Sequence, residues 1–225
     1  MVDRQSRHHT GLNRSMLTAC RTSIGNSHRP QDVPLGDSDE TWFSLFGVRS
    51  RPHRMKGRNV MTLATLKDVY IDQLQDVYSA NRQSQKATEK LINAATDADL
   101  KAALQRSLEG TNNGIEIVAD LVKGHDAEPT GEFCKGMEGI VKEVNAHVLE
   151  ADFSDNDVRD AMIITQYQRM AHYAIAGYGC VVAFARRLGL SEEASKLQKC
   201  LDETYSGDRT FSDIAENGIN RKAAA

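Results

Sequence analysis

Four long stretches of the chain repeat apolar residues at steps of three and four, the spacing that lines one face of an α-helix. Leu66, Tyr70 and Leu74 illustrate this pattern in the first stretch. Proline interrupts helices, and only Pro129 follows Pro52. We therefore predict four long helices, at about 63–95, 96–123, 155–188 and 191–217.

A shorter amphipathic segment, at about 134–150, separates the second long helix from the third. It follows a connection over residues 124–131, and no segment has the alternating pattern of a β-strand. A long link with its own helix suits a crossover between neighbouring helices of a bundle. The predicted fold is therefore an all-α, up-down four-helix bundle over residues 61–220, with a short crossover helix.

The charge is distributed unevenly along the chain. Residues 1–60 hold ten basic and five acidic side chains, whereas the remainder holds 18 basic and 26 acidic ones. An acidic body argues against nucleic-acid binding. The sequence contains no uncharged run of about 18 apolar residues, so we expect no membrane-spanning helix. The four cysteines form no C-x-x-C pair, so we expect free thiols and a cytoplasmic location.

Residues 1–60 lack a sustained periodicity and are predicted to form a disordered, basic extension. Three alternatives stay open. The first 31 residues are rich in arginine, as in an organelle transit peptide. Translation can also begin at Met55 or Met61, where the regular pattern starts. The apolar patch at residues 42–48 can instead dock on the bundle or on a partner.

Residues 167–184 (YQRMAHYAIAGYGCVVAF) form the most apolar long run in the chain. We predict that this run is the central buried helix of the bundle. His172 lies in the middle of this run, with Ala171 directly before it and Ala174 two residues after it. We interpret His172 as an indication that a binding site lies at this level of the bundle.

Each of the four apolar stripes becomes polar or small near its middle, at Asn81, at residues 109–111, at His172, and at Thr204 with Asp208. Buried polar groups need partners, so we expect these side chains to share one layer. Bundle cores that hold two metal ions are built in this way. A hydrogen-bonded network without a metal explains the same pattern.

Several motifs resemble the YciE/YciF family of bacterial ferritin-like proteins, which are often linked to stress responses. In chain order these motifs are DVYIDQLQDVYSANRQ, LEGT, CKGMEGI, VRDA, HYAIAGYG, LDETYSGD and AENGIN. The resemblance extends from Met61 to the C-terminus and does not include residues 1–60. It implies a ferritin-like four-helix bundle, usually dimeric, with a carboxylate-rich site for two metal ions.

The chain departs from this family at the positions that would bind metal. The family usually has glutamate where this chain has Asn81, Ala171, Ala174 and Thr204. Losing about four carboxylates removes the groups that bridge two ions and neutralise their charge. The substitutes are small or neutral, which a core can bury without a metal.

Glu109, His172 and Asp208 best match the ligand positions that remain in this chain. The preferred hypothesis is a non-catalytic, stress-associated protein without a resident cofactor, acting as a homodimer or through a protein partner. The alternative is a redox or peroxide-protection protein that holds iron or manganese with these three residual ligands. No phosphate-binding loop, G-x-S-x-G or H-E-x-x-H motif supports another enzyme class.

Overall fold

The computed structural model describes residues 63–225, and the regular secondary structure of this part of the chain is helical, without a strand. The predicted all-α class is therefore confirmed, while the predictions for residues 1–60 lie outside the described residues. The elements are α1 Leu66–Ala94, α2 Ala98–Gly124, α3 Lys135–Val144, the π-turn η1 Asn145–Leu149, α4 Asn156–Arg187, α5 Ser191–Ile214, the π-turn η2 Ala215–Ile219 and α6 Asn220–Ala223.

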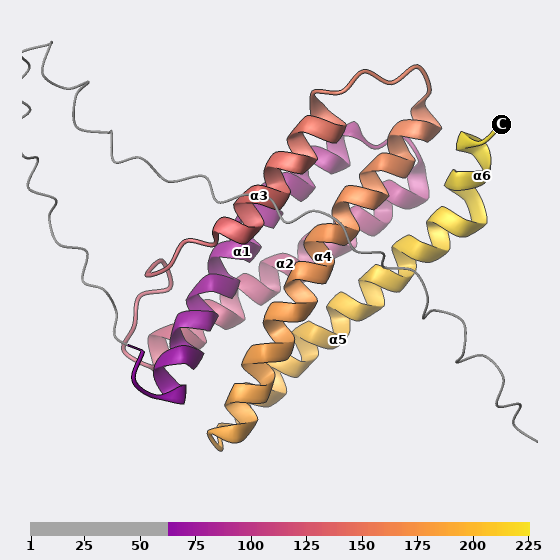
Figure 1. Cartoon of the computed structure of the whole chain (residues 1–225). Helices are drawn as coiled ribbons and strands as arrows, with labels where there is room; N and C mark the ends of the chain where they lie inside the picture. Colours follow the sequence, from indigo (N-terminus) through magenta and orange to yellow (C-terminus); the bar gives the residue numbers. More distant parts are fainter. Residues whose placement is uncertain (1–62) are drawn as a thin grey trace, which may run out of the picture. The chain divides into compact units, whose positions relative to one another are not determined.

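The long helices α1, α2, α4 and α5 form a four-helix bundle (Figure 1). In the bundle, α1 packs beside α2 and α4, and α5 packs beside the same two helices. The crossover helix α3 lies against α1 and α4 and returns the chain to the other end of the bundle (Figure 1). As a result α4 runs in the same direction as α2, and each of the four long helices is antiparallel to the long helices beside it, whereas α3 runs parallel to α1.

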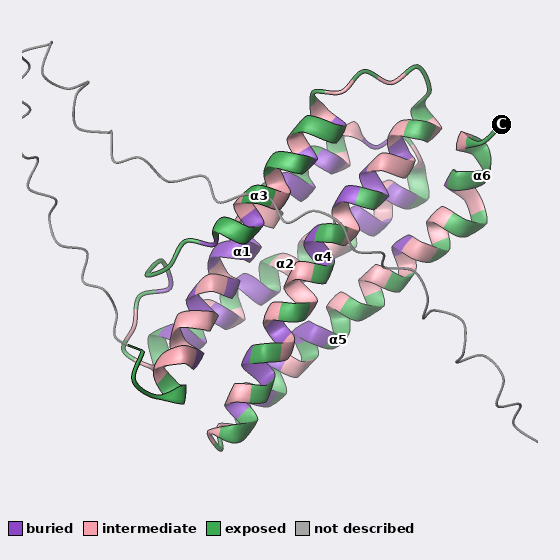
Figure 2. Ribbon diagram, in the orientation of Figure 1, coloured by how far each residue is buried: buried purple, intermediate pink, exposed green. Residues whose placement is uncertain are grey.

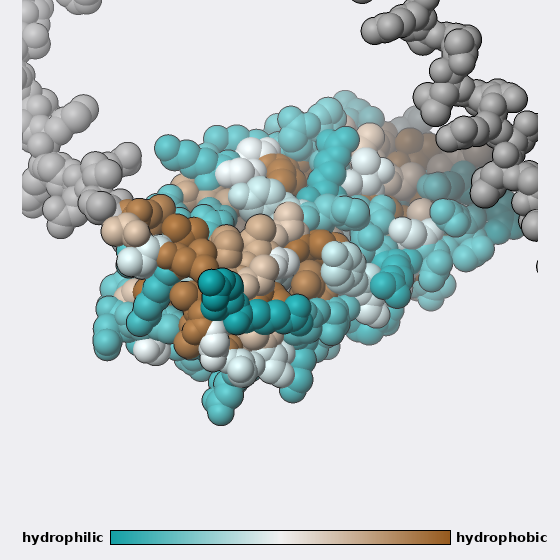
Figure 3. All heavy atoms as spheres, turned by 60° about the horizontal axis from the view of Figure 1, so that its bottom comes forward, coloured by the Kyte–Doolittle hydropathy of each residue, from teal (hydrophilic) through white to brown (hydrophobic). Residues whose placement is uncertain are grey.

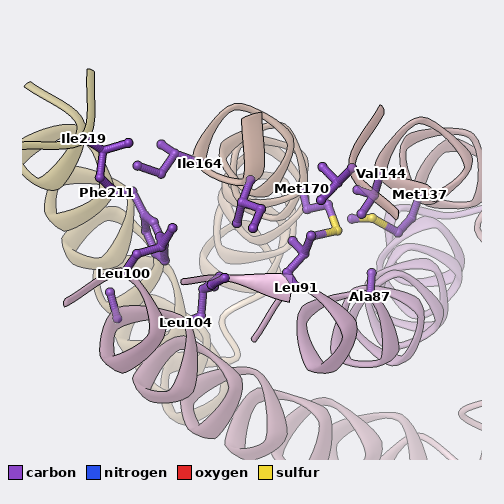
Figure 4. Packing of buried hydrophobic residues seen from close by; sticks show 14 of the residues in the cluster. Ala87, Leu91, Leu100, Leu104, Met137, Val144, Ile164, Met170, Phe211 and Ile219 are labelled. Atoms are coloured by element: carbon purple, nitrogen blue, oxygen red, sulfur yellow. The ribbon is translucent and has the colours of Figure 1, made fainter. Parts of the chain in front are cut away.

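The interior contains two apolar clusters, one toward each end of the bundle. Figure 2 shows that buried residues occur along all four long helices. The cluster at the end where α1 finishes includes Leu91, Met170 and, from α3, Met137 (Figure 4). The cluster at the opposite end includes Tyr70 and Leu197, both fully buried. The middle of the bundle lies between these clusters.

Side-chain caps decide where most of the helices begin. Thr65 and Asp68 form a reciprocal capping box, so α1 begins at Leu66, three residues later than predicted. Asp97 caps α2, and Asp155 caps α4. Each carboxylate accepts backbone N–H groups that lack partners within the helix.

The turn between α4 and α5 contains a glycine in a left-handed conformation. Gly189 has φ +76°, the left-handed conformation expected after a helix end. The last long helix, α5, begins at Ser191, as its periodicity predicted. The residue at the cap position is Leu190, which makes no side-chain capping bond. Backbone bonds from Gly189 and Leu190 back into α4 close this turn instead.

Asp160 of α4 fixes the connection between α1 and α2. Its fully buried carboxylate accepts the Thr96 amide at 2.9 Å, the Thr96 hydroxyl at 2.7 Å and the Asp97 amide at 2.7 Å. These donors belong to the turn that precedes α2, so the buried carboxylate obtains its hydrogen-bond partners by holding this turn in place.

No helix in the part of the chain that the structure describes is long and apolar enough to cross a membrane. The three cysteines in this part, Cys134, Cys180 and Cys200, are free thiols.

We predict that Asp160→Ala destabilises the bundle by about 3 kcal/mol, because three donors in the turn before α2 lose a charged acceptor. The melting temperature should fall by roughly 6–12 °C. Asp152→Ala is the control, since Asp152 is exposed in the connection before α4 and should change little. Equal melting temperatures for the two variants would contradict the assigned role of Asp160.

Candidate functional site

A cavity of about 510 Å³ lies in the middle of the bundle, between the two apolar clusters. Side chains from α1, α2, α4 and α5 line it, and those that matter most here are Asn81, Thr88, Thr111, Ala171, Tyr178 and Thr204. The predicted polar layer is therefore present, with Asn81, Thr111 and Thr204 in it.

The four positions where the resemblance places glutamate all line this one cavity. They are Asn81 on α1, Ala171 and Ala174 on α4, and Thr204 on α5. Positions from three helices therefore border the same space, as the ligand positions of a two-metal site in a bundle do. In this chain the side chains at these four positions carry an amide, two methyl groups and a hydroxyl in place of carboxylates.

A hydrogen bond joins two of the helices across the cavity. Asn81, which is 4% exposed, donates its side-chain amide to the Tyr178 hydroxyl at 2.8 Å. Burial raises the pKa of Tyr178 well above its ordinary value, so the phenol stays neutral. Burial, together with the nearby Glu203 carboxylate, also raises the pKa of the Cys200 thiol in the cavity wall. The wall is therefore neutral where it is deepest.

Gly114 of α2 makes room for this hydrogen bond. A Cβ atom at this position would lie 2.5 Å from the Tyr178 hydroxyl and 3.7 Å from the Asn81 amide nitrogen. Gly110, one turn earlier, also faces the cavity but has nothing within 4 Å of such an atom. The two glycines in the middle of α2 thus have different environments, although both lower helix propensity.

Four hydroxyl groups of the wall donate to carbonyls of their own helices. Thr88 donates to the Ser84 carbonyl at 2.8 Å, and Ser84 donates to the Asn81 carbonyl at 3.1 Å. Thr111 and Thr204 likewise donate to carbonyls four residues earlier, at 2.9 and 2.7 Å. Each hydroxyl proton is used in this way, and each oxygen keeps lone pairs free to accept.

His172 and Asp208 form a pair outside this cavity. The His172 Nε2 atom lies 3.1 Å from an Asp208 carboxylate oxygen, and the His172 side chain is 65% exposed. Gln168 donates to the other carboxylate oxygen at 3.0 Å. The prediction that His172 is buried in the core is therefore wrong. Successive helical residues are rotated by about 100°, so the face that buries Ala171 turns His172 outward.

Glu109 lines the cavity but is itself exposed, so its carboxylate lies where the cavity meets solvent. Among residues 63–225, no three or more His, Cys, Asp or Glu side chains are grouped so that they could hold a metal ion. The structure therefore brings together His172 and Asp208, and it does not bring Glu109 to them.

The sequence analysis missed Tyr178, the buried partner of Asn81. Its spacing was the available signal, because Tyr178 follows Ala171 by seven residues and Ala174 by four, which places all three on one helical face. The analysis also missed a second polar group, in which the Tyr70 hydroxyl donates to Glu193 at 2.7 Å.

His125 belongs to that second group, with its Nε2 atom 3.1 Å from the Glu193 carboxylate. Its ring meets the Tyr70 ring edge-on, with centroids 5.7 Å apart. Burial and the Glu193 carboxylate raise the pKa of Tyr70 above its ordinary value. This group ties the starts of α1 and α5 to the end of α2.

We predict opposite effects for alanine at the two glycines of α2. Gly114→Ala should destabilise the protein by about 1–3 kcal/mol, because the added methyl group displaces the Tyr178 hydroxyl from Asn81. Gly110→Ala should stabilise it by up to about 1 kcal/mol through helix propensity. Urea denaturation of both variants measures the difference, and equal effects would contradict the described packing.

A family model described as "Domain of unknown function (DUF892)" matches residues 65–224. This span coincides with the helical part of the chain that contains the cavity.

A curated relative, Protein YciF of Escherichia coli (strain K12), is 35% identical over 164 residues, which are 72% of this chain and 98% of YciF. The crystal structure of the E. coli stress protein YciF matches with a TM-score of 0.65 at 33% identity, covering 70% of this chain and 99% of YciF. The structure of YcfI from Rhodopseudomonas palustris matches with a TM-score of 0.65 at 31% identity, covering 69% and 98%. The chain therefore belongs to the DUF892 family, the YciE/YciF family that its helical motifs resemble.

Proposed function

We propose that this chain is a non-catalytic, ferritin-like, stress-associated protein that acts as a dimer or through a protein partner. The relationship to a protein described as a stress protein supports the physiological setting. We also propose that the protein is cytoplasmic and that it binds neither nucleic acid nor membranes. These parts of the proposal rest on the charge of the body, its free thiols and the lack of a described membrane-spanning helix.

One observation carries the non-catalytic assignment. The cavity is lined by Asn81, Ala171, Ala174 and Thr204 at the four positions where the family usually has glutamate. Two divalent ions need several carboxylates for charge neutralisation and bridging. The buried wall instead offers a neutral hydrogen bond between Asn81 and Tyr178, and hydroxyls that are bonded to their own helices.

The alternative function is that of an iron- or manganese-binding redox or peroxide-protection protein. The observation that favours it is the pair of His172 and Asp208, 3.1 Å apart and open to solvent. A histidine and a carboxylate can serve as two ligands of an open, single-ion site. Glu109 is the third candidate ligand for this function.

Elemental analysis separates the two functions. We expect the full chain, purified after growth with added iron and manganese, to contain far fewer than one tightly bound ion per chain. The physical reason is the missing carboxylate charge in the cavity. Two bound ions per chain would contradict the preferred function.

One bound ion per chain, lost in His172→Ala, would instead support the alternative. His147→Ala is the matched control, because His147 is also exposed and also pairs with a carboxylate, that of Glu143 at 3.0 Å. The two variants should give the same low metal content under the preferred function.

The proposed dimer needs an apolar contact surface. Figure 3 shows apolar residues gathered at the end of the bundle that is lower in Figure 1. Leu63 and Leu66, 46% and 36% exposed, lie at the start of α1 at this end. Half-buried Leu188 and Leu190 lie in the α4–α5 turn at the same end. Burying such side chains between two copies would favour association.

We expect light scattering of the full chain to give the mass of two copies. Leu66→Glu should shift the protein toward the monomer, because it places a charge in the proposed contact. Val158→Glu is the control, since Val158 is 41% exposed in the first turn of α4 at the opposite end. A monomeric wild-type protein would contradict dimerisation, and an unaffected Leu66→Glu dimer would contradict this surface.

A further inference from the structure

Several hydroxyl groups in the cavity wall can accept further hydrogen bonds. Ser84, Thr88, Thr111 and Thr204 have all given their protons to carbonyls of their own helices. Their oxygens retain free lone pairs and line the cavity from three different helices. An occupant that bears N–H or O–H groups would therefore find acceptors on several sides.

The charged side chains of the lining lie where the cavity meets solvent. They are Arg106, Glu109 and Glu203, all three of which are exposed. Two carboxylates thus face one guanidinium at the mouth, and the buried part of the lining carries no cation. An anionic occupant would leave its charge unpaired inside, which is costly, whereas a cation at the mouth meets an excess of negative charge.

The cavity is large enough for an organic molecule. Its volume of about 510 Å³ falls within the roughly 300–1,000 Å³ that is usual for small-molecule sites. Ala171 and Ala174 supply an apolar wall on the α4 side, with Met170 and Phe211 beside them. The open space at Gly110 adds to the room on the α2 side.

We propose that this cavity binds a small organic amine: an ammonium group joined by a short carbon chain to a second hydrogen-bond donor. The ammonium group lies at the mouth beside Glu109 and Glu203, the carbon chain follows the alanines of α4, and the second donor reaches the hydroxyl wall. The inference rests on the proposed function in one respect, namely that no two-metal centre fills the same space.

Isothermal titration of the full chain with putrescine, a four-carbon diamine, tests the proposal. We expect one saturable site per chain, and affinity at least tenfold higher than for butanediol or succinate, which share the chain length but lack the ammonium groups. Glu109→Gln with Glu203→Gln should weaken putrescine binding at least tenfold. Glu116→Gln is the control, because Glu116 is exposed on α2 outside the lining and should leave binding unchanged.

A variant that fills the cavity tests whether putrescine binds inside it. Gly110→Leu should abolish binding by filling the cavity, whereas Gly139→Leu, at an equally open glycine of α3 outside the lining, should not. Circular dichroism of both variants verifies that they are folded. No putrescine binding, equal binding of butanediol, or full binding by folded Gly110→Leu would each overturn the proposal.

Metal analysis of the same wild-type samples keeps the two conclusions apart. A metal-poor chain that ignores putrescine would overturn the amine site and leave the proposed function intact. A chain with two bound ions would overturn the proposed function, and with it the amine site.

Discussion

The hydrogen bond from Asn81 to Tyr178 pairs two buried polar side chains in the middle of the bundle. It joins α1 to α4, and α2 can approach them only because Gly114 has no side chain. Apolar clusters on both sides of this layer bury the rest of the helical faces. A buried amide and a buried phenol that satisfy each other need no ion between them, which is why the neutral lining is compatible with a folded core.

The carboxylate of Asp160 has a structural use in the same bundle. It is fully buried, yet it lies at the turn before α2 and takes its donors from Thr96 and Asp97. The Asp160 carboxylate and the neutral buried wall of the cavity illustrate where acidic groups lie in this bundle. The buried acid is bonded to backbone, while Glu109 and Glu203 stay in contact with solvent. Charge is thus kept out of the centre, where a cavity of about 510 Å³ is left for a small molecule.

Helical periodicity predicted the four long helices and the crossover to within a few residues, because burial on one face imposes that spacing on the sequence. Local capping was harder to predict. The Thr65–Asp68 capping box makes α1 begin three residues later than predicted, and α5 begins without a side-chain cap. A side-chain cap depends on the exact conformation of one turn. Several polar residues near a helix start can take the capping position, so the sequence alone does not determine which one does.

The sequence by itself determined the helical class, the crossover and the positions where the family's carboxylates are replaced. Only the tertiary structure decided which side chains meet. It placed Asn81, Ala171 and Thr204 around one cavity, and it placed His172 outside with Asp208. Periodicity gives the direction of a residue about its own helix axis. Which of those directions is the interior depends on how the four helices are rotated against one another, and packing alone sets that rotation.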